Sequence, residues 1–230
     1  MPARGNATGK LIGSGRTADV YEIDAAWVLR RNREDWGDAA AEGAVMEHVR
    51  AHGYPVPRVR TEDLGTSRTD LVMERLTGPT MVEAFVAGAI DAVEAGAVLA
   101  SLLRQLHAIP GRRPGTRVLH LDLHPENVLL TPDGPRVIDW ATAEDGDPGL
   151  DWGLSAIILA QVAVDDDQPV AGPARAMLVS LLADPSGLTG EGLAEARRRR
   201  AVNPTMTPRE VELLGTAEEL VRSLVALREP

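Results

Sequence analysis

The sequence contains no cysteine, and aromatic residues make up only 3% of its 230 residues. The absence of cysteine excludes disulfides and thiolate metal sites, and it is consistent with a reducing compartment. Because aromatic side chains are scarce, leucine, valine, isoleucine and alanine must fill the core. Hydrophobic side chains make up 44% of the chain, which is enough for one large domain or two small lobes.

Long apolar runs and an excess of positive charge are also missing. The longest apolar stretch, residues 154–164, is interrupted by Ser155 and Gln161 and is shorter than the roughly 20 residues that a bilayer requires. The first ten residues include no apolar run, so we expect no signal peptide. A net charge of −10 argues against nucleic acid as a partner and favours cationic small molecules. We therefore expect a cytoplasmic protein that binds neither membrane nor nucleic acid, and the sequence carries no indication of its oligomeric state.

The first third of the chain predicts strands and one helix. Residues 9–23 read as a strand, a glycine-bearing turn and a second strand, and residues 25–32 as a third strand after a turn at 24–26. Residues 36–53 predict a helix that ends at Gly53 and places Glu42, Met46 and Val49 on one face. An extended connector over 54–59 and a strand over 69–74 complete this part.

Beyond residue 74 the patterns change to helix. Helical periodicity covers residues 80–89 and 91–109, short strands surround a loop between 117 and 140, and residues 150–164 predict a buried helix. Two or three further helices are expected after that. The fold class is therefore α+β, with a small β-rich part followed by a larger, mostly helical part.

Two glycines, Gly13 and Gly15, lie in the segment GSGRTADV at residues 13–20. Their spacing suits a turn that brings backbone N–H groups close to phosphate, but the third glycine of the G-x-G-x-x-G pattern is replaced by Ala18. A simple hairpin turn explains the segment equally well.

The segment HLDLHPENVLL, residues 120–130, places polar side chains in an apolar stretch. If the segment is a strand, His120, Asp122 and His124 share one face, which would suit a metallohydrolase site. Alternatively, Asp122 is followed by Asn127 five residues later and by Asp139 twelve residues after that. This spacing matches a carboxylate that takes a hydroxyl proton, with an amide and a second carboxylate that bind Mg²⁺.

With these motifs, the chain resembles the aminoglycoside phosphotransferase and choline kinase family, which has a bilobal protein-kinase-like fold. HLDLHPENVLL resembles the catalytic loop of that family, and VIDW at 137–140 resembles its metal-binding segment. In GDPGLDWGLS, residues 146–155, the resemblance implies that Asp151 anchors the catalytic loop. It also implies that His120 is structural, and it leaves open whether His124 braces the loop or lies near the transferred phosphoryl group.

The resemblance implies a phosphate-binding cation on the strand WVLRR, residues 27–31, paired with a helix glutamate. The matching residues are Arg30 and Glu42, so arginine stands where the family has lysine. Arginine keeps the charge, but it is longer, planar and never deprotonated. This departure is compatible with a slower kinase, an altered nucleotide preference or an inactive relative.

The family resemblance implies an ATP-dependent phosphotransferase acting on a hydroxyl of a small molecule such as an aminoglycoside, amino alcohol or sugar. A catalytically weak or inactive kinase-like protein is the alternative. The expected cofactors are ATP, with GTP as the alternative nucleotide, and Mg²⁺. Residues 1–75 would form the nucleotide-binding lobe, and residues 76–230 the helical lobe with the catalytic loop and substrate site. The implied site consists of Asp122 as catalytic base, Asn127 and Asp139 as metal ligands, and nucleotide-binding residues Gly13, Gly15, Val20, Val28, Arg30, Glu42, Met73, Glu74 and Leu76.

Overall fold

The computed structural model describes residues 9–15, 17–33, 37–63 and 67–226. The chain divides into two compact units, one made of Met1–Gly78 with Thr131–Ala141, the other of Pro79–Leu130 with Thr142–Pro230. Among the described residues, no helix combines the length and apolar character needed to cross a membrane.

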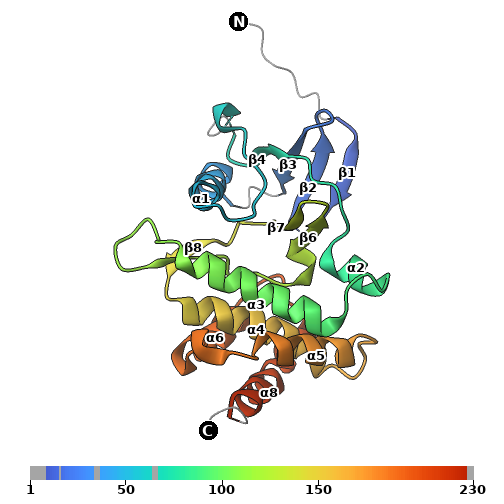
Figure 1. Cartoon of the computed structure of the whole chain (residues 1–230), viewed down its shortest axis with the longest axis vertical. Coiled ribbons are helices and arrows are strands. Elements are labelled where there is room, and N and C mark those ends of the chain that lie inside the picture. The colour runs from blue at the N-terminus through green and yellow to red at the C-terminus, as the bar shows by residue number, and fades with distance from the viewer. Residues whose placement is uncertain (1–8, 16, 34–36, 64–66, 227–230) are drawn as a thin grey trace, which may run out of the picture. The chain divides into compact units, whose positions relative to one another are not determined.

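The first unit is built on a four-stranded antiparallel sheet, drawn in blue to teal in Figure 1. Its strands follow one another in chain order: β1 (Leu11–Ser14), β2 (Ala18–Glu22), β3 (Trp27–Asn32) and β4 (Asp70–Glu74). Asp24 closes the turn between β2 and β3, since its carboxylate accepts hydrogen bonds from the backbone N–H groups of Ala26 and Trp27. The predicted strands and this turn are confirmed.

Strand β3 alternates between buried and half-buried side chains. Val28 and Arg30 point to the same buried face, with exposed fractions of only 4% and 6%. In the register of the sheet, Val28 lies opposite Met73 of β4, and Arg30 lies opposite Val20 of β2. The sheet therefore places a buried cation among apolar side chains, which requires a charged partner.

Helix α1 (Ala39–Ala51) supplies that partner. Asp38 caps its N-terminus by accepting hydrogen bonds from two backbone N–H groups, and Gly53 follows its end with a φ of 82°. Glu42, Met46 and Val49 are all buried on one face, as predicted. The helix contacts β4. The short 3₁₀ helix η1 (Thr61–Asp63) and strand β7 (Gly134–Val137) also belong to this unit.

The second unit is a helical assembly around α4 (Pro148–Ala163). Nearly every side of α4 is buried, because it contacts helices on several sides (Figure 1). The other helices are α2 (Met81–Val86), α3 (Ala92–Ala108), α5 (Ala171–Leu181), α6 (Gly190–Ala201), α7 (Pro208–Glu212) and α8 (Leu214–Ala226). Four helices lie between residues 171 and 226 rather than the expected two or three, because the last helical segment is interrupted at Leu213.

Helices α4 and α6 approach one another closely through glycine. A Cβ atom on Gly192 would lie 2.2 Å from the carbonyl carbon of Gly149, and one on Gly153 would lie 2.9 Å from the carbonyl oxygen of Gly192. Larger side chains at these positions would force the helices apart. The contact fixes the first turns of α4, where Asp151 lies.

Short strands and turns precede α4, as predicted. Strand β5 (Arg117–Leu119) pairs antiparallel with β8 (Glu144–Gly146), and the 3₁₀ helix η2 (Pro125–Asn127) leads into β6 (Val128–Thr131). The 3₁₀ helix η3 (Pro185–Gly187) lies between α5 and α6.

Candidate active site

The polar segment after β5 is a loop, not a strand. Strand β5 ends at Leu119, and Leu121 adopts a left-handed backbone conformation with a φ of 66°. Such a conformation is costly for a branched residue and persists only where its surroundings enforce it. The expectation that His120, Asp122 and His124 alternate on one strand face is therefore wrong.

Asp151 enforces this loop conformation. Its carboxylate, which has no exposed surface, accepts hydrogen bonds from the backbone N–H of His120 at 2.9 Å and from that of Leu121 at 2.7 Å. Burial alone would raise the pKa of Asp151, but hydrogen bonds from His107 and the His120 backbone outweigh it and lower the pKa. The carboxylate stays ionised and fixes the two residues before Asp122.

Asp122 lies in this loop with about a third of its side chain exposed (34%). The side-chain amide of Asn127 donates to the Asp122 carbonyl at 2.8 Å and to its Oδ2 at 3.2 Å. The imidazole of His124 accepts at Nδ1 from the Glu126 backbone N–H, so its hydrogen lies on Nε2, 3.5 Å from the same Oδ2. These contacts tie His124 to the loop on both sides of it in the chain.

The surroundings of Asp122 favour its ionised form. Burial opposes ionisation, but the hydrogen bond with His124 and the positive charge of nearby groups, Arg200 of α6 among them, lower the pKa of Asp122 below its usual value. His120 adds a smaller electrostatic effect in the same direction, and its Nδ1 accepts a hydrogen bond from the Asp122 backbone N–H at 3.3 Å, which helps to hold the loop. A carboxylate that is ionised, oriented and still reachable by solvent is suited to accept a proton.

The interpretation of His120, Asp122 and His124 as metal ligands is contradicted. Within the part of the chain that the structure describes, no three His, Asp or Glu side chains are grouped so that they could hold a metal ion. The Nδ1 atoms of both histidines already accept backbone hydrogen bonds.

In the first unit, Arg30 bridges two carboxylates. Its Nη1 lies 2.5 Å from Glu42 Oε2, and its Nη2 lies 2.9 Å from Asp139 Oδ1. The predicted pair of Arg30 and Glu42 therefore exists, and Arg30 also binds the aspartate that was expected to bind metal. Burial raises the pKa of Glu42, and the nearby Asp139 adds to this effect, whereas Arg30 opposes it.

The segment after β7 is held to α1 by the same glutamate. The backbone N–H of Trp140 donates to Glu42 Oε1 at 3.2 Å, and the Trp140 ring packs edge-on against Tyr54. Asp139 has a φ of 62°, so its backbone is left-handed like that of Leu121. Its side chain is 38% exposed. Glu42 thus fixes both the cation of β3 and the turn that presents Asp139.

The remaining predicted nucleotide-binding residues lie along the sheet of the first unit. Gly13 pairs with Val20, and the backbone N–H of Gly15 donates to the Ala18 carbonyl, which confirms the turn between β1 and β2. Met73 and Glu74 end β4, and Leu76 follows two residues later, all of them half-buried. Of this segment, residue 16 lies outside the described residues.

The structure gives Arg30 a larger role in stability than a surface residue has. We expect Arg30→Met to lower the free energy of unfolding by about 3–5 kcal/mol, because it leaves two carboxylates without their counter-charge. Arg30→Lys should cost less, since its single nitrogen keeps the charge. Urea denaturation measures both, with Arg31→Met as the matched control. Arg31 pairs with Asp70 near the surface, where a pair contributes at most about 1 kcal/mol. Equal losses for Arg30→Met and Arg31→Met would contradict this role.

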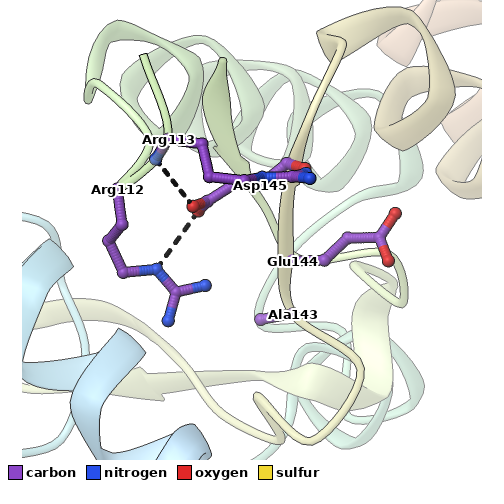
Figure 2. Close-up of a pocket in the computed structure, with 5 residues that line it drawn as sticks. All are labelled: Arg112, Arg113, Ala143, Glu144 and Asp145. Atoms are coloured by element: carbon purple, nitrogen blue, oxygen red, sulfur yellow. Dashed lines mark hydrogen bonds and ion pairs between the residues drawn. The ribbon is translucent and has the colours of Figure 1, made fainter.

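The acidic residues of strand β8 are neutralised by arginines. The Asp145 carboxylate accepts from Arg112 Nε at 3.2 Å and from the Arg113 backbone N–H at 3.1 Å. Figure 2 shows these contacts in a pocket of the second unit. Glu144 pairs with Arg199 at 2.7 Å. These two carboxylates therefore offer little uncompensated negative charge to a cationic ligand.

Sequence reasoning missed His107, which donates to Asp151 in the second unit. Its Nε2 lies 2.9 Å from Asp151 Oδ2, and its side chain is buried. A signal existed: Ala100 and Leu103, seven and four residues earlier, lie on the buried face of α3, so helical periodicity places His107 on that face as well.

Comparison with known proteins identifies the protein family of this chain. The chain belongs to the phosphotransferase enzyme family, whose family model matches residues 8–117 and 111–177. A search of curated proteins finds no match.

Several solved structures share the fold of this chain. The chain is similar to the streptomycin–ATP complex of APH(2")-IIa, with 12% identity over 92% of each chain and a TM-score of 0.52. It is also similar to the GDP and kanamycin complex of APH(2")-IIIa, with 14% identity, 96% of this chain and 93% of that chain covered, and a TM-score of 0.52. Against the ethanolamine kinase of Plasmodium vivax, identity is 12%, coverage 95% and 75%, and the TM-score 0.54. The predicted family and kinase-like fold are confirmed.

Proposed function

We propose that this protein transfers the γ-phosphoryl group of ATP to a hydroxyl of a small molecule. The observation that carries the proposal is the arrangement of Asp122, a partly exposed carboxylate held by Asn127 and His124 in a loop anchored by Asp151. Such a group can accept the proton of an acceptor hydroxyl as that oxygen attacks phosphorus.

Asn127 and Asp139 fit the role of Mg²⁺ ligands by their chemistry. The hydrogen bonds of Asn127 to Asp122 use its amide nitrogen, which leaves its carbonyl oxygen for a cation. Asp139 is partly exposed and binds Arg30 through Oδ1. Mg²⁺ in kinases needs only one or two protein ligands of this kind, because phosphate oxygens and water complete its shell. When bound, the ion neutralises charge that develops on the phosphates.

The first unit would bind the nucleotide. Arg30, held by Glu42, would place positive charge near the phosphates, and the turn at Gly13 and Gly15 would offer backbone N–H groups. The hinge would lie along the end of β4 and beyond it, at Met73, Glu74 and Leu76. ATP is the proposed donor and GTP the alternative, a choice supported by solved relatives bound to ATP and to GDP.

Aminoglycosides, amino alcohols and sugars are the proposed acceptors. Kinase relatives of the same fold bind streptomycin and kanamycin, and another is an ethanolamine kinase. All three compounds are cationic at neutral pH, and the net charge of −10 suits such ligands. The comparisons give no support to the alternative of an inactive kinase-like protein.

Metal-dependent nucleotide binding provides the first test. We expect calorimetry to show that ATP binds more tightly with Mg²⁺ than without it, and that Asp139→Ala abolishes this difference, because Asp139 would supply a carboxylate ligand. Asp133→Ala, which removes an exposed carboxylate from the turn before β7, is the matched control and should bind like the wild type. An unchanged metal effect in Asp139→Ala would contradict the assignment.

Transfer itself is tested with a panel of kanamycin, streptomycin, ethanolamine and glucose. ADP release above the rate with water alone, together with a phosphorylated product seen by mass spectrometry, is the expected result for at least one acceptor class. Nucleotide binding without any phosphorylated product would count against transfer to these acceptors.

A further inference from the structure

The pocket in Figure 2 combines one buried carboxylate with exposed arginines. Its volume of about 560 Å³ is enough for a small molecule. The Asp145 side chain is only 4% exposed, whereas the Arg112 side chain is 40% exposed and Arg113 is exposed as well. Glu144, the other acidic residue of the lining, already pairs with Arg199. The pocket therefore presents guanidinium groups, and little carboxylate charge, to an incoming molecule.

Asp145 holds both arginines in fixed positions. Its Oδ1 accepts from Arg112 Nε at 3.2 Å, and the terminal nitrogens of that guanidinium are turned away from the carboxylate (Figure 2). Its Oδ2 accepts from the Arg113 backbone N–H at 3.1 Å, and its backbone carbonyl accepts from Arg113 Nη2. A guanidinium that is oriented in advance loses less conformational entropy when it binds an anion.

The turn that carries these arginines is closed by its own hydrogen bonds. The backbone N–H of Gly111 donates to the Thr116 carbonyl at 2.9 Å, and Thr116 Oγ1 donates to the Arg113 carbonyl at 2.7 Å. A Cβ atom on Gly111 would lie 2.2 Å from Thr116 Oγ1, so the two sides of the turn are in close contact. The turn therefore presents its arginines from a fixed backbone.

Positive charge exceeds negative charge around this turn. Arg117, at the start of β5, lies opposite Gly146, the residue that follows Asp145 in β8. Arg117 is exposed and pairs with no carboxylate among the described residues. Three exposed arginines, at positions 112, 113 and 117, thus accompany a single buried carboxylate, in a chain whose net charge is −10. A local excess of positive charge attracts anions.

We propose that this pocket binds a phosphate group, either inorganic phosphate or the phosphate of a small molecule. The terminal nitrogens of Arg112 form a planar pair of donors that suits two oxygens of one phosphate, and Arg113 adds a second positive charge for the dianion. A chloride ion has neither the paired oxygens nor the second charge. None of these residues is assigned to phosphoryl transfer, so the site goes beyond the proposed function and does not depend on it.

An NMR titration with inorganic phosphate, replacing chloride at constant ionic strength, tests the site. We expect saturable shifts of the backbone amide signals of Arg113 and Asp145. In Arg112→Gln the Kd should rise at least about tenfold, because charge-assisted hydrogen bonds are lost. Arg112→Lys, which keeps the charge, should raise the Kd less. Arg222→Gln, the same change at an exposed and carboxylate-paired residue of α8, is the matched control and should bind like the wild type.

Glycerol 3-phosphate, compared with glycerol, separates the two sources of the phosphate group. Equal affinities for the ester and for inorganic phosphate would show that the phosphate group suffices, and tighter binding of the ester would identify a phosphorylated small molecule. Shifts of the same size in chloride, or the same Kd in Arg112→Gln and Arg222→Gln, would overturn the site. If Arg112→Gln does not fold, Arg112→Lys takes its place, and a Kd equal to that of Arg222→Gln would overturn the site as well.

Discussion

Asp122→Asn is expected to lower kcat for phosphoryl transfer by about 10²–10⁴-fold, the usual contribution of a general base. The amide of asparagine cannot accept the hydroxyl proton, yet its oxygen can still receive the hydrogen bond from Asn127. The loop should keep its shape, because Asp151 holds the backbone of the two preceding residues. ATP binding measured by calorimetry should therefore stay close to that of the wild type.

The control for this variant is Asp184→Asn, the same chemical change at an exposed cap of η3. Asparagine caps as well as aspartate does, so kcat and stability should not change. Activity of Asp122→Asn within threefold of the wild type would show that another group takes the proton. Loss of ATP binding together with activity would instead indicate that the variant has disturbed the fold.

The pH dependence of kcat gives an independent check on Asp122. A lowered pKa keeps the carboxylate in the basic form as pH falls, so protonation of Asp122 should not reduce kcat above about pH 5. Removing the His124 side chain should raise the pKa of Asp122, because the hydrogen bond of His124 lowers that pKa. In His124→Ala we expect the acidic limb of the kcat profile to move to higher pH, measured against the wild type in the same buffers. Identical profiles would contradict the role of His124.

Most of the first unit could be predicted from the sequence, because its turns, strands and helix depend on residues that are close together in the chain. The turn at Asp24 depends on a side chain two and three residues from its partners, and the alternation along β3 places Val28 and Arg30 on one face. Helical periodicity likewise placed Glu42 on the buried face of α1. The pair of Arg30 and Glu42 could be expected from these patterns together with the family resemblance. The additional bond from Arg30 to Asp139 could not, because 109 residues separate them.

The catalytic loop shows what local patterns miss. Alternating polar residues at 120–124 suggest a strand, but the conformation is set by Asp151, 30 and 31 residues further along the chain. Two buried backbone N–H groups that donate to a carboxylate form stronger hydrogen bonds than they would form in continued strand pairing. The result is a left-handed Leu121, which no local propensity favours. The family resemblance predicted the anchor, and only the structure reveals the donor from α3 that completes it.

Asp151→Asn should be among the most destabilising single substitutions in the second unit. The wild-type carboxylate meets three N–H donors, and an asparagine amide has only one acceptor oxygen, so its nitrogen must face at least one of them. Each hydrogen bond to a charged group contributes about 1.5–3 kcal/mol, and we expect a loss of about 3 kcal/mol in the free energy of unfolding. That corresponds to a fall in Tm of roughly 6–12 °C for a chain of this size. Asp147→Asn, at the exposed cap of the same helix, is the matched control and should be neutral.

The pH dependence of the stability lost in Asp151→Asn shows whether the charge of Asp151 or only the packing of its side chain stabilises the protein. Because the pKa of Asp151 is lowered in the folded protein, its stabilising contribution is present above the unfolded pKa of about 4 and is lost as pH falls through the lower folded value. The difference in stability between wild type and Asp151→Asn should therefore be constant at neutral pH and shrink in acid. A difference that stays the same down to low pH would mean that the amide disrupts packing alone. A shrinking one would show that an ionised carboxylate, buried and fully hydrogen-bonded, holds the catalytic loop in place.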